Sequence, residues 1–198
     1  MASFSRRIAA GVVLAFLMIA GLALWSVKAV AADKGGRDSA GTDYCTQTGG
    51  VVELRSPAYN TNGGGQPLRL AGSANFCRYT ASDGSRIHLT VNTLVATLPT
   101  LAALAYYAEE QCTTCGGGGN PASYYCSQLG GTDLFGGVNA AGGGWEGPGI
   151  DKVLDTCIFP DLSSIDSWGL YYHSAGIIRG IDLSTVLKYP NPYAPVKK

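Results

Sequence analysis

The chain has 198 residues, of which 46% are hydrophobic and 14% charged, with equal numbers of basic and acidic side chains. The charges are scattered and form no basic stripe, which argues against nucleic acid as a partner. Six cysteines, an even number, favour an oxidising compartment in which they form disulfide bonds. Ten of the 28 glycines lie in three tracts, at residues 63–65, 116–119 and 142–144, which we interpret as flexible loops or linkers.

The first 31 residues have the pattern of an export signal. Arg6 and Arg7 precede an apolar, uncharged run over residues 8–27, and residues 29–31 offer a small-x-small cleavage site. A general secretory signal fits better than a twin-arginine signal, because nothing after the arginine pair extends that motif. The run is also just long enough to span a bilayer, so an uncleaved N-terminal anchor is the alternative and the only membrane contact that we expect. Cleavage after Ala31 would remove three basic residues and no acidic one, which leaves a net charge of about −3.

The rest of the chain contains one pattern twice. Tyr-Cys-Thr-Gln-Thr-Gly-Gly at residues 44–50 returns as Tyr-Cys-Ser-Gln-Leu-Gly-Gly at residues 125–131. In each copy a second cysteine follows about thirty residues later, and a pair of tyrosines comes near the end. We therefore divide the chain into an export signal or anchor (1–31), a disordered leader (32–42), repeat one (43–115), a glycine hinge (116–119), repeat two (120–176) and a C-terminal tail (177–198).

Repeat one begins with three predicted strands. They cover residues 51–55, 76–80 and 86–91, and an Asp-Gly turn lies between the last two. In the second strand Phe76 and Arg78 fall on one face, and Cys77 and Tyr79 fall on the other.

A helix is predicted over residues 98–111. Leu101, Leu104, Ala105 and Ala108 recur at helical spacing. The apolar run is short and acidic residues follow it, so we expect this helix to pack on the sheet instead of crossing a membrane.

Repeat two opens with a predicted short helix at residues 120–126. Asn120 suits its N-cap and Pro121 its first helical position, and the Gly-Gly pair ends it. A strand over residues 156–159 and a turn over residues 160–164 follow. These elements predict an α+β fold made of two small repeats, each an antiparallel sheet of about three strands with short helices. Because each repeat alone would bury little surface, we expect the two to pack into one body.

These motifs carry a resemblance to a known family. Residues 120–131 match an opening Asn-Pro-Ala-Ser-x-Tyr-Cys followed by Gly-Gly, residues 157–163 match a Cys before a Pro-Asp-Gly-Ser turn, and Trp168 precedes the second tyrosine pair. In this the chain resembles two tandem copies of a small exported bacterial domain (domain of unknown function 333) that is often labelled hemolysin-like. The two copies cover most of the chain after the export signal, and no pore-forming or lytic element accompanies them.

The resemblance also implies the disulfide bonds. It pairs Cys45 with Cys77 and Cys126 with Cys157, one bond in each repeat, which would stabilise each by roughly 3–4 kcal/mol. The family carries further cysteines where this chain has Ile87 and Ile165, and repeat two has no cysteine after its tyrosine pair. Cys112 and Cys115 are therefore left over together.

The pair Cys112 and Cys115 forms a Cys-x-x-Cys motif. It follows the expected helix of residues 98–111, where the helix dipole and Glu109 and Glu110 all disfavour a thiolate. We therefore expect a structural disulfide, either local or to another position, and keep a redox function as the alternative. A zinc site would need His88 and His173 as well, and we interpret both as surface residues, so we expect no metal and no cofactor.

No catalytic arrangement of residues is evident. The sequence has no Gly-x-Ser-x-Gly and no Asp-x-Asp calcium loop, and we expect no catalytic residue and no enzyme. The spacing of the aspartates in repeat two fits turns and a solvated face, at Asp151, Asp155, Asp161 and Asp166.

The candidate binding residues are Trp145 and Trp168. Trp145 follows three glycines, so it is either a contact anchor on an exposed loop or a side chain folded back over its own hairpin.

The sequence predicts an exported, non-catalytic, disulfide-stabilised binding module associated with the bacterial envelope. The expected partner is an envelope protein or another protein, and the expected location is periplasmic or secreted, or anchored through the N-terminal segment. Two alternatives remain: a protein resembling secreted protease inhibitors, and a redox protein that uses its Cys-x-x-Cys pair.

Overall fold

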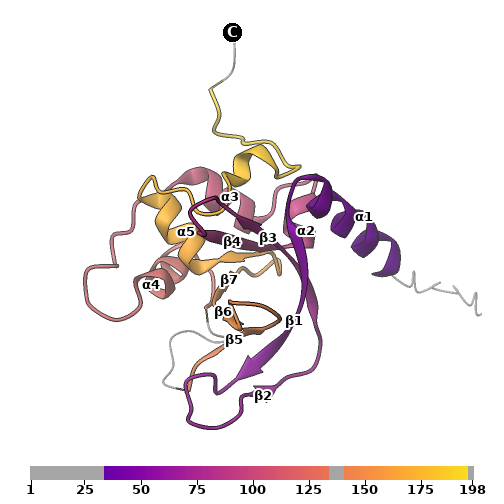
Figure 1. Cartoon of the computed structure of the whole chain (residues 1–198). Helices are drawn as coiled ribbons and strands as arrows, with labels where there is room; N and C mark the ends of the chain where they lie inside the picture. The colour runs from indigo at the N-terminus through magenta and orange to yellow at the C-terminus, as the bar shows by residue number, and fades with distance from the viewer. Residues whose placement is uncertain (1–33, 134–140, 196–198) are drawn as a thin grey trace, which may run out of the picture. The chain divides into compact units, whose positions relative to one another are not determined.

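A computed structural model of the chain describes residues 34–133 and 141–195 (Figure 1). The expected export signal or anchor lies outside these residues. Within them, no helix is both long enough and apolar enough to cross a membrane. The described residues combine helices with an antiparallel sheet, which confirms the predicted α+β class.

The sheet is antiparallel throughout the part of the chain that the structure describes. Its strands are β1 (Val51–Tyr59), β2 (Leu68–Arg69), β3 (Ala74–Thr80), β4 (Arg86–Thr90), β5 (Gly143–Glu146), β6 (Val153–Leu154), β7 (Thr156–Ile158) and β8 (Ser164–Asp166). They lie in the order β6-β5-β1-β3-β4-β8-β7, and β2 pairs with the far end of β1. Strands from the two halves of the chain pair directly at two places, β1 with β5 and β4 with β8.

The helices gather on one face of this sheet. They are α1 (Lys34–Gln47), α2 (Val91–Val95), α3 (Leu101–Ala108), α4 (Pro121–Gln128), α5 (Ser167–Ser174) and a 3-10 turn, η1 (Leu183–Thr185). One buried cluster joins side chains from all five α-helices to the strands, with Leu94, Tyr106, Tyr125 and Leu170 among the helical members. We call this side of the sheet the helix-covered face.

Alternation along β3 and β4 separates the helix-covered face from its opposite. Cys77 pairs with Leu89 across the two strands, and both are fully buried against the helices. Arg78 pairs with His88, and their side chains point to the other face. The division predicted for β3 is therefore confirmed, with Arg78 on one side and Cys77 on the other.

The opposite face carries charged side chains from β1, β3 and β4, and we call it the charged face. Its members include Glu53, Arg55, Arg78, Arg86 and His88. Strands β5 and β6 fold back over it, and the Trp145 ring lies 5.2 Å from the Phe76 ring, measured between centroids. Trp145 therefore packs over the charged face, on a strand of the other half of the chain, and not over its own hairpin.

Two corners of the fold have the same geometry. In each, a helix ends at a Gly-Gly pair whose first glycine has a positive φ, 88° at Gly49 and 82° at Gly130. The second glycine donates its N–H to a half-cystine carbonyl, over 2.8 Å from Gly50 to Cys45 and 2.9 Å from Gly131 to Cys126. Neither second glycine has room for a side chain, because a Cβ atom would lie 2.4 Å or less from the sulfur of Cys77 or Cys157.

The disulfide bonds lock these corners to the sheet. Cys45–Cys77 and Cys126–Cys157 form the two pairings implied by the resemblance, with Cα atoms 5.7 and 5.4 Å apart. The two cysteines on strands also share one row of the sheet, because Cys77 pairs with Leu89, Leu89 with Ile165, and Ile165 with Cys157.

Two helical segments differ from the expectation. Helix α1 covers residues 34–47, most of the segment expected to be a disordered leader, and Gly41 lies so close to Val91 that a Cβ atom would be 2.3 Å from its side chain. The bond from Cys45 to β3 and this close approach to α2 hold α1 in place. Helix α3 is shorter than predicted, and it buries the face of Ala102 and Tyr106 while Leu101 is exposed.

Candidate functional site

A polar cavity of about 380 Å³ lies on the charged face, and we call it the polar cavity. Its lining comes from β4, from β6 and the residues on either side of it, from β8, from α5 and from the segment after α5. The lining residues are Arg86, His88, Asp151, Val153, Leu154, Asp155, Asp166, Trp168, Tyr172 and Arg179.

Strand pairing brings the first polar residues together. Because β4 pairs with β8 through Leu89 and Ile165, the preceding His88 and the following Asp166 become neighbours on the charged face. Asp166 also caps α5 by accepting the Gly169 N–H over 3.0 Å. Its other oxygen lies 3.3 Å from His88 Nδ1, so one carboxylate both starts the helix and orients the imidazole.

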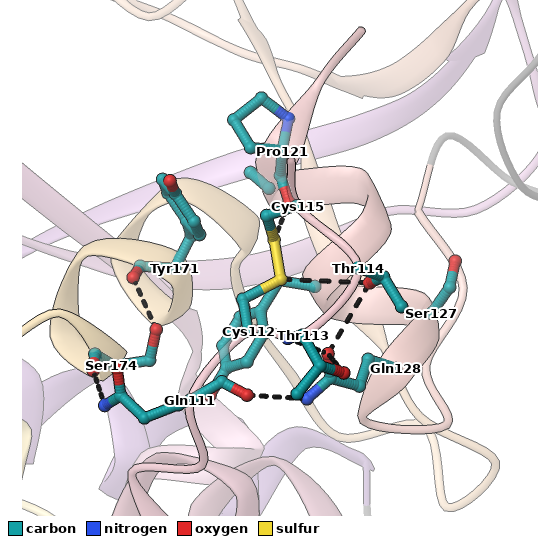
Figure 2. The surroundings of a disulfide bond; sticks show 12 residues. Gln111, Cys112, Thr113, Thr114, Cys115, Pro121, Ser127, Gln128, Tyr171 and Ser174 are labelled. Carbon is teal, nitrogen blue, oxygen red and sulfur yellow. Dashed lines mark hydrogen bonds between the residues drawn. A yellow bond between two sulfur atoms is a disulfide. The ribbon is translucent and has the colours of Figure 1, made fainter. Parts of the chain in front are cut away.

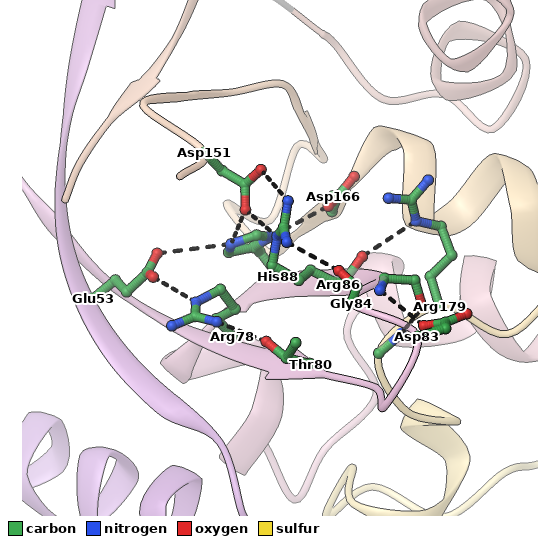
Figure 3. A network of polar contacts seen from close by, with 12 residues as sticks. Glu53, Arg78, Thr80, Asp83, Gly84, Arg86, His88, Asp151, Asp166 and Arg179 are labelled. Carbon is green, nitrogen blue, oxygen red and sulfur yellow. Dashed lines mark hydrogen bonds and ion pairs between the residues drawn. The ribbon is translucent and has the colours of Figure 1, made fainter. Parts of the chain in front are cut away.

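His88 is almost completely buried, with 1% of its surface exposed. Its Nε2 atom has no hydrogen-bond partner among the described residues. The same atom lies 3.7 Å from Glu53 Oε2 and 3.7 Å from Asp151 Oδ2, between the two carboxylates drawn in Figure 3. A buried polar atom without a partner is costly, and it therefore calls for an explanation such as a bound molecule.

Ion pairs hold the surrounding carboxylates in their charged form. Burial opposes the ionisation of Glu53, but hydrogen bonds from Arg55 and Arg78 outweigh it and keep the pKa of Glu53 below its usual range. Burial likewise opposes the ionisation of Asp151, and the two-pronged contact with Arg86, at 2.5 and 3.1 Å, lowers its pKa on balance. The pairs Arg78–Glu53 and Arg86–Asp151 are visible in Figure 3, and the second fixes two residues that line the polar cavity.

The pKa of Asp155 shifts in the opposite direction. Burial and the nearby carboxylates of Asp133 and Asp166 raise the pKa of Asp155 to about 7. Its carboxyl group has no hydrogen-bond partner among the described side chains, although it lines the polar cavity. Near neutral pH this group can therefore either accept or donate a hydrogen bond inside the cavity.

Helix α5 supplies an aromatic wall. Trp168 and Tyr172 are one helical turn apart, and their ring centroids lie 5.8 Å apart at an angle of 30°. Both side chains are half-buried and line the polar cavity. The Arg179 guanidinium lies 4.9 Å from the centre of the Tyr172 ring, and Arg179 Nε donates to the Arg86 carbonyl.

The two candidate binding residues are separated. Trp168 lines the polar cavity, whereas Trp145 packs on Phe76 and lines a second cavity of about 390 Å³ that also contains Leu54 and Ile158. The structure thus does not bring the two tryptophans into one cavity.

The third disulfide bond joins Cys112 to Cys115, in the loop between α3 and α4 (Figure 2). Hydrogen bonds fasten this loop to α4, with Thr113 N and Oγ1 both donating to Gln128 Oε1 and Gln128 Nε2 donating to the Gln111 carbonyl. The bond closes a local loop, one of the two structural possibilities left open by the sequence. None of the six cysteines lines the polar cavity.

The expectation that both histidines lie at the surface is wrong. His88 is buried beneath Asp151 and Asp166, and His173 is only 8% exposed because it stacks on Tyr106, with ring centroids 3.7 Å apart. Within residues 34–133 and 141–195, no group of three or more His, Cys, Asp or Glu side chains is arranged to hold a metal ion.

The interpretation of the repeat-two aspartates as a solvated face is also wrong in part. Asp151, Asp155 and Asp166 line the polar cavity, and only Asp161 lies away from it. Asp161 accepts the Leu101 N–H over 2.8 Å and so helps to begin α3. One signal was present in the sequence, since the alternation that faces Ile87 to the core also puts Arg86 and His88 together on the other side.

The polar cavity can therefore bind a small ligand through an aromatic wall, carboxyl groups of opposite pKa shift and a buried imidazole. Comparison of the chain with protein-family models, with curated proteins and with solved structures gives no match.

Proposed function

We propose that the protein is an exported, non-catalytic binding module, stabilised by disulfide bonds, whose ligand belongs to the cell envelope and occupies the polar cavity. One observation carries the proposal: a buried His88 Nε2 without a partner beside a cavity with an aromatic wall. Ligand pockets have this composition, an apolar wall with a few convergent polar groups.

The cavity suits binding better than turnover. Binding needs a rigid lining, and the ion pair between Arg86 and Asp151, which both line the cavity, supplies rigidity. Covalent catalysis by a Ser, Thr, Cys or Lys nucleophile would need one of these residues in the lining, and none of them lines the cavity.

We also propose that the chain consists of two tandem copies of the exported domain that its motifs resemble. The matching corners at Gly49–Gly50 and Gly130–Gly131 support this, because they share φ, hydrogen bonds and disulfide geometry. In this view the copies share one sheet, and the polar cavity arises where they meet, with Arg86 and His88 from the first copy and Trp168 from the second.

A periplasmic or secreted location follows from the same proposal. The three disulfide bonds are compatible with an extracytoplasmic compartment, where the surroundings keep cysteines oxidised.

Thermal unfolding of the purified protein tests the proposal against fractions of a bacterial envelope extract. At least one fraction should raise the melting temperature, since a ligand at one hundred times its Kd stabilises the folded state by about 2.7 kcal/mol. The Trp168→Ala variant should lose the shift. The Tyr59→Ala variant, which removes an exposed ring remote from the cavity lining, should keep it.

Two results would contradict the proposal. One is a melting-temperature shift in no fraction, or a shift that Trp168→Ala leaves intact. The other is turnover of substrates in a panel of hydrolase and thiol-oxidase assays.

A further inference from the structure

We infer that the ligand of the polar cavity is a neutral sugar, with one ring face stacked on Trp168 and its hydroxyl groups bound by the surrounding aspartates and His88. This inference rests on the proposed function and names the chemical class of its ligand.

The charge of the lining argues for a neutral ligand. Three carboxyl groups, at Asp151, Asp155 and Asp166, face two guanidinium groups, at Arg86 and Arg179. A phosphate site needs cations in excess, and here Arg86 is already bound through two nitrogens by Asp151. A cation stacked on Tyr172 would have to compete with the Arg179 guanidinium, which lies 4.9 Å from the centre of that ring.

The unused hydrogen-bonding groups argue for hydroxyls. The Asp155 carboxyl group lines the cavity, and the buried His88 Nε2 has no hydrogen-bond partner among the described residues, with carboxylate oxygens of Glu53 and Asp151 3.7 Å away. The two groups offer different combinations of donor and acceptor. A hydroxyl group can donate one hydrogen bond and accept others, so it fits either partner whichever of them carries a proton. Several hydroxyls in fixed positions, as on a sugar ring, could satisfy both groups at once.

The aromatic wall argues for a ring with an apolar face. Trp168 and Tyr172 present half-buried rings at 30° to each other, and Arg179 already occupies one side of Tyr172. Trp168 is therefore the ring that is left for stacking. A sugar ring has hydroxyls at its edge and C–H groups on its faces, so it matches an indole bordered by carboxyl groups. The cavity volume of about 380 Å³ falls within the range of small-molecule sites.

Titration of the purified protein with neutral oligosaccharides tests the inference. The probes are trisaccharides of glucose, N-acetylglucosamine, mannose and galactose, and the comparison ligands are inorganic phosphate and choline. Isothermal calorimetry and tryptophan fluorescence should show saturable binding of at least one trisaccharide, and no binding of phosphate or choline in the polar cavity.

Variants assign the binding to the cavity. Trp168→Ala should weaken the binding at least tenfold, Trp168→Phe should weaken it less because a ring remains, and Tyr59→Ala should leave it unchanged. Circular dichroism and melting temperature check that each variant is folded, and Trp168→Phe serves if the alanine variant is not.

The outcomes separate the two proposals. If no trisaccharide binds in a Trp168-dependent way while an envelope fraction still does, the sugar inference is overturned and the proposed function stands. If phosphate or choline takes the Trp168 site, the sugar inference is overturned in the same way. If neither an envelope fraction nor any trisaccharide depends on Trp168, both proposals fail.

Discussion

The two faces of the sheet differ in chemistry, although neighbouring residues of the same strands form them. On the helix-covered face Cys77 and Leu89 are completely buried among apolar side chains, and two disulfide bonds join that face to α1 and α4. One position along each strand, Arg78 and His88 point to the charged face, where carboxylates and guanidinium groups surround the polar cavity. The stabilising apolar burial is thus concentrated on one face, and the chemistry that could recognise a ligand on the other.

The charged face can hold buried polar groups because the helix-covered face, with its apolar core and disulfide bonds, stabilises the fold. Buried ion pairs contribute little net stability, since the desolvation of the charges offsets their attraction. The apolar core and the disulfide bonds must therefore supply most of the folding free energy. Variants on the two faces should differ accordingly, and the expected losses of stability below run from the largest to the smallest.

The largest effect is expected on the charged face itself, from Arg55→Met. Arg55 is completely buried and bridges Glu53 to the carbonyls of Trp145 and Asp151 in the segment that covers this face. Its loss leaves the buried Glu53 with less compensation, so urea denaturation should show a destabilisation of about 3–5 kcal/mol. The double variant Glu53→Gln with Arg55→Met should recover part of it. A loss below about 1 kcal/mol would show that Arg55 does not anchor this face.

Removal of the bond Cys45–Cys77 should have the next largest effect. The bond joins residues 32 positions apart, so the double alanine variant should lose about 4 kcal/mol in the chain-entropy account. The matched variant of Cys126–Cys157, with a separation of 31, should lose about the same, while the local Cys112–Cys115 should matter less than half as much. Binding in the polar cavity should survive at temperatures where the variants remain folded. Clearly unequal losses of stability on removal of Cys45–Cys77 and of Cys126–Cys157 would show that the two corners are not equivalent.

A smaller effect on the helix-covered face is expected from Gly131→Ala. The added Cβ atom would lie 2.3 Å from the Cys157 sulfur and 2.9 Å from the Cys126 sulfur, and the bonded sulfurs cannot swing away. We expect a destabilisation of about 1–3 kcal/mol, measured as a lower melting temperature. Gly116→Ala is the control, because a Cβ atom there meets no other atom within 4 Å. Equal melting temperatures for the two variants would mean that the corner accommodates the added methyl group with no loss of stability.

The last prediction is a change in the pH dependence of stability, from Asp155→Asn. The folded-state pKa of Asp155 is raised to about 7, above the value of about 3.9 expected in the unfolded chain. Its contribution is therefore fully present below about pH 4 and is lost as pH rises through about 7. Melting temperatures measured between pH 4 and pH 8 should fall less steeply with pH in the variant than in the parent protein. Identical profiles would show that Asp155 is not buried beside Asp133 and Asp166.

Local patterns predicted four of the described strands, β1, β3, β4 and β7, and the helices α3 and α4. The N-cap and first-turn proline of α4 are read from two adjacent residues, and Asn120 indeed accepts the N–H groups of Ala122 and Ser123. The alternation in β3 predicted which face each side chain takes. These features could be read from the sequence because they depend on contacts within one turn or one strand.

The polar cavity could not be predicted in the same way. Asp151, Asp155 and Asp166 lie in a segment rich in turn residues, where a solvated aspartate and a buried one have the same local pattern. Their roles depend on β4 pairing with β8, which brings His88 to Asp166 from 78 positions away. The similarity of the two halves in sequence also did not predict that their strands pair with each other.

The sequence by itself determined the α+β class, the positions of four of the eight described strands and of α4, and the alternation that divides the sheet into two faces. It also contained the duplicated Tyr-Cys and Gly-Gly pattern from which the resemblance implied two of the disulfide pairs. Only the tertiary structure decided that α1 is a packed helix, that both histidines are buried and that three aspartates share a cavity with Trp168. The physical reason is the separation of the interacting residues along the chain. Helix caps and strand alternation depend on residues that are close in sequence, whereas strand pairing between distant segments decides which charges are buried together.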